Sequence, residues 1–151
     1  MMKFMKIRRV QMENIVEFRI KGQPQGKARP RFNGNHTYTP KATKDYEHLV
    51  RTSYIAQCGN KMNDFNRIAI KAYFEIPKSA TKKERAEIMA GKKVNKKPDI
   101  DNIIKIILDS LNGLAYADDK QITKIEAIKS YTLGESEVWV TLEREENVGF
   151  K

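Results

Sequence analysis

Five aspartates fall within one short stretch of the sequence, residues 97–121 (KPDIDNIIKIILDSLNGLAYADDKQ). Asp99 and Asp101 stand one residue apart, whereas Asp118 and Asp119 are adjacent. Mg²⁺ prefers oxygen ligands and keeps several of its water molecules, so two or three carboxylates are enough to bind it. If the chain between the two pairs folds back on itself, both pairs can converge on one such cation.

The residues between the two pairs predict a helix from about Asn102 to Asn112 that ends at Gly113, a residue type common just after helices. Asp101, Lys105 and Asp109 follow one another at intervals of four residues and therefore share one stripe of this helix, a carboxylate–ammonium–carboxylate ladder. A second, wide face is apolar, and we expect it to be buried. Its members are Ile103, Ile104, Ile107, Leu108 and Leu111.

Each of these features also has an ordinary structural explanation. An aspartate at a helix start usually caps the helix, and Asp118–Asp119 before Lys120 fits a turn. Asp101 and Lys105 fit an exposed pair that contributes about 0.3–0.5 kcal/mol. The combination of these features in one stretch, rather than any one of them, favours a cation site.

At these residues the sequence resembles the signature of the RusA-type Holliday-junction resolvases, small endonucleases common in bacterial prophages. The family pattern is roughly P-D-x-D-N-[LI]-x-K-x-x-x-D-[AS]-L-N-G, followed by an aromatic residue and then D-D-x-Q-[VI]. The chain matches this pattern from Pro98 to Ile122. The resemblance is specific because the pattern is long, gapped and mostly polar.

The resemblance implies a role for most of the matched polar residues. Asp99, Asp101 and Asp119 would be the catalytic carboxylates and would bind Mg²⁺, with Mn²⁺ as the alternative ion. Lys105 matches the family's essential lysine, which would stabilise charge on the scissile phosphate or orient the attacking water. Its alternative role is to pair with Asp101 or Asp109 and so hold the metal-free site together.

Charge is unevenly distributed along the chain, whose formal net charge is +10. Residues 1–60 carry +8 (12 basic, 4 acidic), residues 61–98 carry +7 (11 basic, 4 acidic) and residues 99–151 carry −5 (6 basic, 11 acidic). A strongly positive surface attracts polyanions such as nucleic acids. An acidic pocket within it repels phosphate unless cations fill it, which favours a metal-dependent nuclease. The alternative is a basic protein whose lysines only keep it soluble.

Two basic segments are candidates for contact with a nucleic-acid backbone. Lys27, Arg29 and Arg31 alternate with other residues, so they would project to one side of an extended chain and suit phosphate oxygens. Lys96 and Lys97 directly precede the acidic stretch. The alternative for both segments is a solvated loop or linker.

The first of these segments belongs to a long Gly- and Pro-rich stretch, residues 21–40, which predicts an ordered loop or arm. Phe32, His36 and Tyr38 are interleaved with its cations and suit stacking on nucleic-acid bases. Alternatively, these aromatic residues pack on the sheet. The form G-x-P-x-x-K-x-R-P-R-F also resembles a stretch in the phage branch of the RusA-type family, which supports a nucleic-acid role.

Hydrophobic periodicity and turn residues predict an α+β fold, with one mixed four-stranded sheet and two or three packed helices. Thr43 is expected to cap a helix at residues 43–57, and Ser79 is expected to cap a short helix within residues 81–91. A turn around Leu133–Gly134 is expected to join the last two strands. The expected strands are residues 15–20, 67–76, 121–131 and 136–143, and the further helices are residues 43–57 and a short helix within residues 81–91.

The length of 151 residues fits one domain. We expect a single RusA-like nuclease domain at residues 15–146, a flexible N-terminal tail at residues 1–14 and a tail at residues 147–151. No apolar run approaches the roughly 20 residues of a transmembrane helix, and the start lacks the apolar core of a signal peptide. The one cysteine, Cys58, cannot form an internal disulfide, which fits a reducing cytoplasm.

Together with these features, the resemblance implies a Mg²⁺-dependent endodeoxyribonuclease that resolves four-way (Holliday) DNA junctions by paired symmetric nicks. Such a junction has near two-fold symmetry, so a homodimer would supply two sites in matching orientation. Three alternatives stay open. They are a nuclease acting on other branched DNA, a non-catalytic nucleic-acid-binding module, and a prophage protein whose basic surface binds another protein.

Deletion of residues 1–11 is expected to leave folding and activity intact, because this segment is predicted to be a loose basic tail outside the domain. Circular dichroism and cleavage of a labelled four-way junction, with truncated and full-length protein side by side, would check this expectation. Loss of folding in the truncated protein would contradict the tail assignment.

Overall fold

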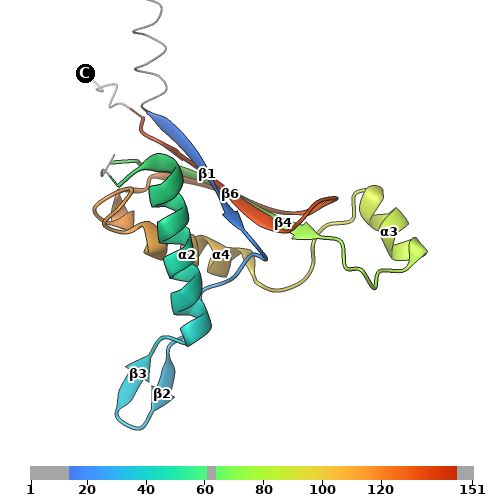
Figure 1. Ribbon diagram of the computed structural model, residues 1–151, viewed down its shortest axis with the longest axis horizontal. Helices are drawn as coiled ribbons and strands as arrows, with labels where there is room; N and C mark the ends of the chain where they lie inside the picture. The colour runs from blue at the N-terminus through green and yellow to red at the C-terminus, as the bar shows by residue number, and fades with distance from the viewer. Residues whose placement is uncertain (1–13, 61–63, 146–151) are drawn as a thin grey trace, which may run out of the picture.

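The computed structural model describes residues 14–60 and 64–145 of the chain (Figure 1). A strand stands at each end of the described part, and the helices lie between them in sequence. In chain order the elements are β1 (Ile15–Lys21), β2 (Arg31–Asn33), β3 (His36–Tyr38), α2 (Lys41–Cys58), β4 (Arg67–Glu75), α3 (Lys82–Met89), α4 (Ile100–Leu111), the 3₁₀ helix η1 (Asp119–Gln121), β5 (Lys124–Thr132) and β6 (Glu137–Glu143).

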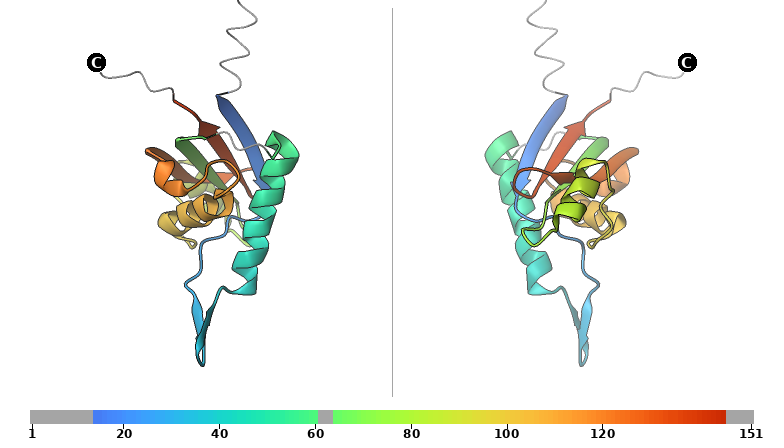
Figure 2. Two further views of the ribbon diagram at one scale, coloured as in Figure 1. Left: turned by 90° about the vertical axis from the view of Figure 1, so that its left-hand side faces the viewer. Right: turned by 90° about the vertical axis from the view of Figure 1, so that its right-hand side faces the viewer.

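Four of these strands form one mixed sheet in the order β1-β6-β4-β5. β4 and β5 run parallel, whereas the β1–β6 and β4–β6 pairs are antiparallel. Figure 2 shows α2 and α4 on the same side of this sheet. The predicted α+β fold with a mixed four-stranded sheet is therefore confirmed, although β5 begins at Lys124 rather than near residue 121.

The last two strands follow each other in sequence but do not pair. β4 lies between β5 and β6, so the turn around Leu133–Gly134 crosses the end of β4 instead of closing a hairpin. The backbone N–H of Glu75, the last residue of β4, donates to Ser136 Oγ at 2.9 Å and fixes this crossing. Periodicity predicts each strand, but the order in which strands pair depends on tertiary packing.

The hydrophobic core lies between the sheet and the helices α2 and α4. Phe18 and Tyr54 meet there edge to face, with ring centroids 5.4 Å apart and an interplanar angle of 79°. Alternate strand residues point into this core, as expected for a sheet with one covered face. The buried strand residues are Phe18, Ile20, Ile68, Ile70, Ala72, Phe74, Val138, Val140 and Leu142.

The buried face of α4 differs slightly from the predicted one. Ile104 and Leu108 are only half-buried, whereas Ile106, which the prediction left out, is completely buried. The buried positions of α4 lie three, four, seven and eight residues after Ile103, which is the spacing of one helix face. This face holds α4 in the core.

Two predicted helix caps are wrong. α2 begins two residues before Thr43, because Pro40 adopts an extended backbone and its carbonyl accepts the Thr43 N–H at 3.1 Å. Thr81 rather than Ser79 caps α3, since Thr81 Oγ1 accepts a backbone N–H of the first turn at 3.1 Å. α4 begins at Ile100, slightly earlier than predicted.

α3 differs from the other two helices because none of its residues is buried. Figure 1 shows it at the far side of the molecule from α2, beyond the ends of the sheet strands. Its charged residues therefore lie at the surface, as the sequence predicted. Within the described residues, no helix has both the length and the apolar character needed to cross a membrane.

Part of the predicted loop at residues 21–40 forms a hairpin, β2–β3, which the sequence analysis did not foresee. The strands pair in antiparallel register around Gly34, whose φ is 63°. Gly34–Asn35 is a two-residue connection of the kind that favours tight hairpins. Figure 1 shows the hairpin projecting past the first turn of α2, away from the sheet.

The predicted tails lie almost wholly outside the described residues, which leave out 1–13 and 146–151. Asn14 is described, and its backbone carbonyl accepts the Arg144 N–H at 2.8 Å. Its side-chain oxygen also accepts from the Arg144 guanidinium at 2.9 Å. These bonds join the two ends of the described chain.

Ile106→Ala is expected to destabilise the protein by about 2–5 kcal/mol, because Ile106 is completely buried and truncation leaves a cavity. Ile100→Ala is the matched control, since it makes the same change in the same helix at a side chain that is 40% exposed. Denaturant unfolding would measure both free energies. Equal losses in the two variants would contradict the packing described.

Candidate functional site

A cleft of about 520 Å³ lies beside the first turn of α4. Five residues proposed from the sequence as functional are brought together in its walls. They are Lys27, Arg29, Lys97, Asp99 and Asp101, and the other lining residues are Gly26, Ala28, Pro98 and Asn102. The cleft therefore combines two carboxylates with three cationic side chains.

One wall of the cleft is formed by the start of α4 and the residues just before it. The other wall includes residues 26–28, here called the docking segment, which contacts α4 directly. The Lys27 N–H donates to the Asn102 carbonyl at 2.9 Å. A Cβ atom at Gly26 would stand 2.8 Å from Pro98 Cβ and 3.0 Å from Asn102 Cβ, closer than such atoms can approach. Only glycine lets the two backbones come this close.

Asp99 and Asp101 keep carboxylate oxygens available to a ligand. Asp99 precedes α4 as its N-cap residue, but its side chain makes no capping hydrogen bond. One Asp101 oxygen accepts the Asn102 N–H at 3.0 Å. Both side chains are exposed, and neither forms an ion pair with another described residue. The capping explanation thus fails for the Asp99 side chain.

Lys27 is held by two carboxylates from different helices. Its Nζ lies 2.9 Å from Glu47 Oε1 on α2 and 3.3 Å from Asp109 Oδ2 on α4. Burial alone would lower the pKa of Lys27, but the hydrogen bonds and negative charges of Glu47 and Asp109 outweigh burial and raise it. Lys27 therefore stays charged and ties the docking segment to both helices. Its contact with phosphate stays a prediction.

Asp101, Lys105 and Asp109 share one stripe of α4, as predicted, but no ion pair joins them. Asp109 pairs with Lys27 rather than with Lys105, because the docking segment brings a second cation within reach. Lys105 is exposed and makes no ion pair within residues 14–60 and 64–145. The alternative in which Lys105 holds the metal-free site together finds no support in this arrangement.

The second aspartate pair is fixed by a network of hydrogen bonds. Asp118 caps η1 by accepting the Lys120 N–H at 3.0 Å, which bears out the turn explanation for this residue. Gln121 Oε1 accepts the N–H groups of Ala117 and Asp118 at 2.8 and 3.1 Å. The Asp119 N–H donates to the side chain of Asn112, discussed next.

Asn112 and Gln121 are positioning residues that the sequence analysis did not single out. Asn112 Oδ1 accepts the Asp119 N–H at 2.9 Å, so the residue that ends α4 also sets the place of Asp119. Both residues occupy fixed polar positions of the motif, within L-N-G and D-D-x-Q. Their place in the motif could have identified them, because Asn and Gln side chains in a loop often accept hydrogen bonds from neighbouring backbone N–H groups.

Three carboxylates gather near the hydroxyl of Tyr116, which donates to the Leu108 carbonyl at 2.8 Å. Burial, together with the charges of Asp119, Asp109 and Asp118, raises the pKa of Tyr116. Burial and the neighbouring Asp118 likewise raise the pKa of Asp119. The pKa of Asp118 is lowered, first by the hydrogen bond from the Lys120 backbone. Negative charge is thus concentrated at the C-terminal end of α4.

The carboxylates predicted to converge are divided between the two ends of α4. Asp99 and Asp101 line the cleft, whereas Asp119 lies in the acidic group beside Asp109. Asp101 and Asp109 are two helical turns apart, about 12 Å along the axis. Among the described residues, no three His, Cys, Asp or Glu side chains are grouped closely enough to hold a metal ion. Convergence on one ion therefore stays a prediction.

A family model described as endodeoxyribonuclease RusA matches residues 21–143. The chain belongs to the RusA endodeoxyribonuclease family. The matched region includes the docking segment, the cleft, α4 and η1, so the resemblance inferred from the motif is confirmed. Every residue proposed for the RusA site lies inside it.

One relative has similarity along most of its length. The uncharacterized protein YqaN of Bacillus subtilis (strain 168) is 28% identical over 132 residues, covering 79% of this chain and 89% of that protein. The similarity thus extends well beyond the motif.

Gly26→Ala is expected to destabilise the protein by about 1–3 kcal/mol, because the added methyl group forces the docking segment away from α4. Gly134→Ala is the matched control, since its Cβ would meet only Thr132 Oγ1 at an ordinary 3.9 Å. Thermal or denaturant unfolding would compare the two variants. If Gly26→Ala were as stable as Gly134→Ala, the close approach of the two backbones would be refuted.

Proposed function

We propose that this RusA-family protein is a metal-dependent endonuclease that resolves Holliday junctions by paired symmetric nicks. The observation that carries the proposal is the cleft. There, Asp99 and Asp101 form no ion pairs with other described residues, although Arg29 and Lys97 line the same walls. Free carboxylates beside cations suit a phosphodiester substrate that needs both a metal ion and positive charge.

The chemistry of Asp99 and Asp101 fits a hard divalent cation. Each carboxylate retains oxygen atoms that no described donor uses. Mg²⁺ is commonly held by one or two carboxylates together with water. In this proposal Asp99 and Asp101 would hold one Mg²⁺, or Mn²⁺ in its place, and Asp119, at the other end of α4, would hold a second. When bound, the ion would lower the pKa of a water molecule and stabilise charge on the scissile phosphate.

The cations of the cleft act on the phosphates in this proposal. Arg29 offers a planar fork of donors that can bind one phosphate at two oxygens. Lys97 adds a point charge on the same wall. Lys105 lies one turn along α4 from Asp101, and its ammonium has no described carboxylate to neutralise it. It is therefore available to a phosphate oxygen that gains charge in the transition state.

Two further cations extend the positive surface on either side of the cleft. Arg31 lies on the hairpin, and Lys96 lies on the connection from α3 to α4, where its Nζ stands 5.1 Å from the centre of the Phe74 ring. Figure 1 shows the hairpin and α3 projecting from the body in different directions, with that connection between them. A branched duplex needs such spaced contacts along its backbones.

Two cuts in a near two-fold symmetric junction require two sites in matching orientation. Each chain would contribute its cleft, so a homodimer would supply both sites. We propose this dimer as the active form, bound to branched DNA in the cytoplasm.

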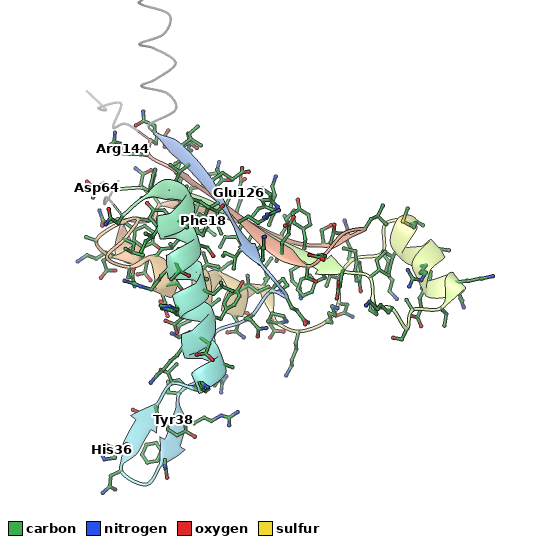
Figure 3. The ribbon with its side chains drawn as sticks, viewed as in Figure 1. Phe18, His36, Tyr38, Asp64, Glu126 and Arg144 are labelled. Carbon is green, nitrogen blue, oxygen red and sulfur yellow. The ribbon has the colours of Figure 1, made fainter. Side chains whose placement is uncertain are left out.

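Asp101→Asn is expected to reduce Mg²⁺-dependent nicking of a four-way junction by at least about 100-fold while junction binding persists, because one metal ligand is lost. Asp64→Asn is the matched control, an exposed aspartate that does not line the cleft and that Figure 3 labels at the opposite end of the molecule from the hairpin. Nicking rates with Mg²⁺ or EDTA and affinities in EDTA would be measured for both variants.

The alternatives give different results in the same assays. Tight junction binding without cuts in any divalent metal would favour the non-catalytic nucleic-acid-binding module. Faster cutting of flaps or forks than of four-way junctions would favour another branched substrate. Weak DNA binding with little salt dependence would favour a protein partner, because phosphate contacts make affinity fall steeply with salt.

Lys105→Ala is expected to slow nicking by about 100- to 1,000-fold with little change in junction affinity, because the lysine acts on charge that develops during the reaction. Lys71→Ala is the control, an exposed lysine between two buried residues of β4, whose side chain therefore points away from the helices. Single-turnover rates and affinities would be compared. A loss of affinity that accounts for the whole loss of rate would contradict this role.

A further inference from the structure

The β2–β3 hairpin exposes aromatic side chains without any covering surface in the described structure. Every residue from Arg31 to Tyr38 is exposed. Phe32 is 76% exposed and Tyr38 is 44% exposed. Large apolar side chains displayed together on one projecting element are characteristic of a contact surface.

The strand register places these side chains on two faces. Phe32 lies opposite Thr37, whereas Arg31 lies opposite Tyr38. Directly opposed residues of an antiparallel pair share a face, so Phe32 projects from one side of the hairpin and the Arg31–Tyr38 pair from the other. Figure 3 shows His36 and Tyr38 at this end of the molecule, well clear of the sheet.

An isolated two-stranded hairpin with no buried face is at best marginally stable in water. This one is held at both ends instead. It follows the docking segment, which bonds to Asn102, and it leads directly into α2 through Pro40, whose carbonyl accepts the N–H groups of Thr43 and Lys44 at 3.1 and 3.2 Å. These attachments at both ends hold the hairpin in a fixed position relative to the cleft.

The charge of this region indicates the class of partner. Residues 28–44 contain four Lys or Arg residues and no Asp or Glu. Arginine and aromatic side chains on one element bind polyanions that also offer planar rings, which describes nucleic acid with unpaired bases. In a continuous duplex the faces of the bases are already stacked, so an exposed Phe side chain gains little there.

We propose that the hairpin is the element that distinguishes branched from continuous DNA, with Phe32 stacking on a base that unpairs at the branch point. Arg31 and Tyr38, on the opposite face, then contact the neighbouring strand. This inference rests on the proposed function, because the DNA bound in the cleft brings its branch point to the hairpin. It adds a specificity-determining residue outside the cleft and outside the acidic motif.

Phe32→Ala tests the proposal by affinity alone. In EDTA, binding of a fluorescent four-way junction is expected to weaken about tenfold, while binding of a linear duplex of the same sequence changes less than about twofold, because only stacking on an unpaired base is lost. Phe32→Trp, which keeps an aromatic ring at this position, should bind the junction with about the wild-type affinity. Leu133→Ala is the matched control, an 81% exposed apolar residue in the β5–β6 turn whose loss should change neither affinity.

Tryptophan fluorescence gives a direct readout of stacking. Phe32→Trp in a Trp139→Phe background should be strongly quenched by a junction and weakly by the duplex, because stacked bases quench indole emission. The same background with Ile15→Trp, at the far end of β1 from the hairpin, should show no such difference. Circular dichroism would establish that each variant is folded.

The outcomes separate this inference from the proposed function. Unchanged junction affinity in Phe32→Ala, or equal losses for junction and duplex, would overturn the inference even if the wild type nicks junctions. Quenching equal for junction and duplex would overturn it as well. If wild-type protein never nicks junctions but Phe32→Ala loses junction affinity selectively, the hairpin assignment stands and the nuclease proposal fails.

Discussion

The contact between the docking segment and α4 is the constraint on which the rest of the site depends. Gly26 permits the approach, and Lys27 secures it by pairing with Glu47 and Asp109 from two different helices. These three side chains are only 20–27% exposed, so solvent screens the ion pairs less than it would at an open surface. This attachment positions the cleft wall and holds one end of the hairpin beyond it.

The same attachment explains how a concentration of like charges is tolerated. At the C-terminal end of α4, Lys27 neutralises Asp109 and the Lys120 backbone stabilises the charge of Asp118, while burial and the neighbouring Asp118 raise the pKa of Asp119. At the N-terminal end, Asp99 and Asp101 receive no such partner among the described residues. The fold therefore neutralises part of one acidic group internally, whereas the other faces a cleft lined by cations, where the proposed Mg²⁺ would bind.

Local patterns predicted the elements well, because periodicity and turn residues are local properties. α4 and the four main strands could be inferred from apolar spacing, and the Gly34–Asn35 connection also carried a hairpin signal. The pairing order of β5 and β6 could not be inferred, since β4 enters between them. Nor could the partners of Lys27, because Glu47 and Asp109 are distant in sequence and only the tertiary fold brings all three together. The motif identified the candidate site, whereas its division between two ends of α4 is visible only in three dimensions.

We propose that the cleft belongs to a junction-resolving nuclease. Mapping of cut positions on a four-way junction, with each strand end-labelled in turn and Mg²⁺ present, tests this most directly. A metal-dependent resolvase would give cuts at equivalent positions in two opposite strands, both abolished by EDTA. Cuts scattered over all strands, or a linear duplex cut as readily as the junction, would contradict it.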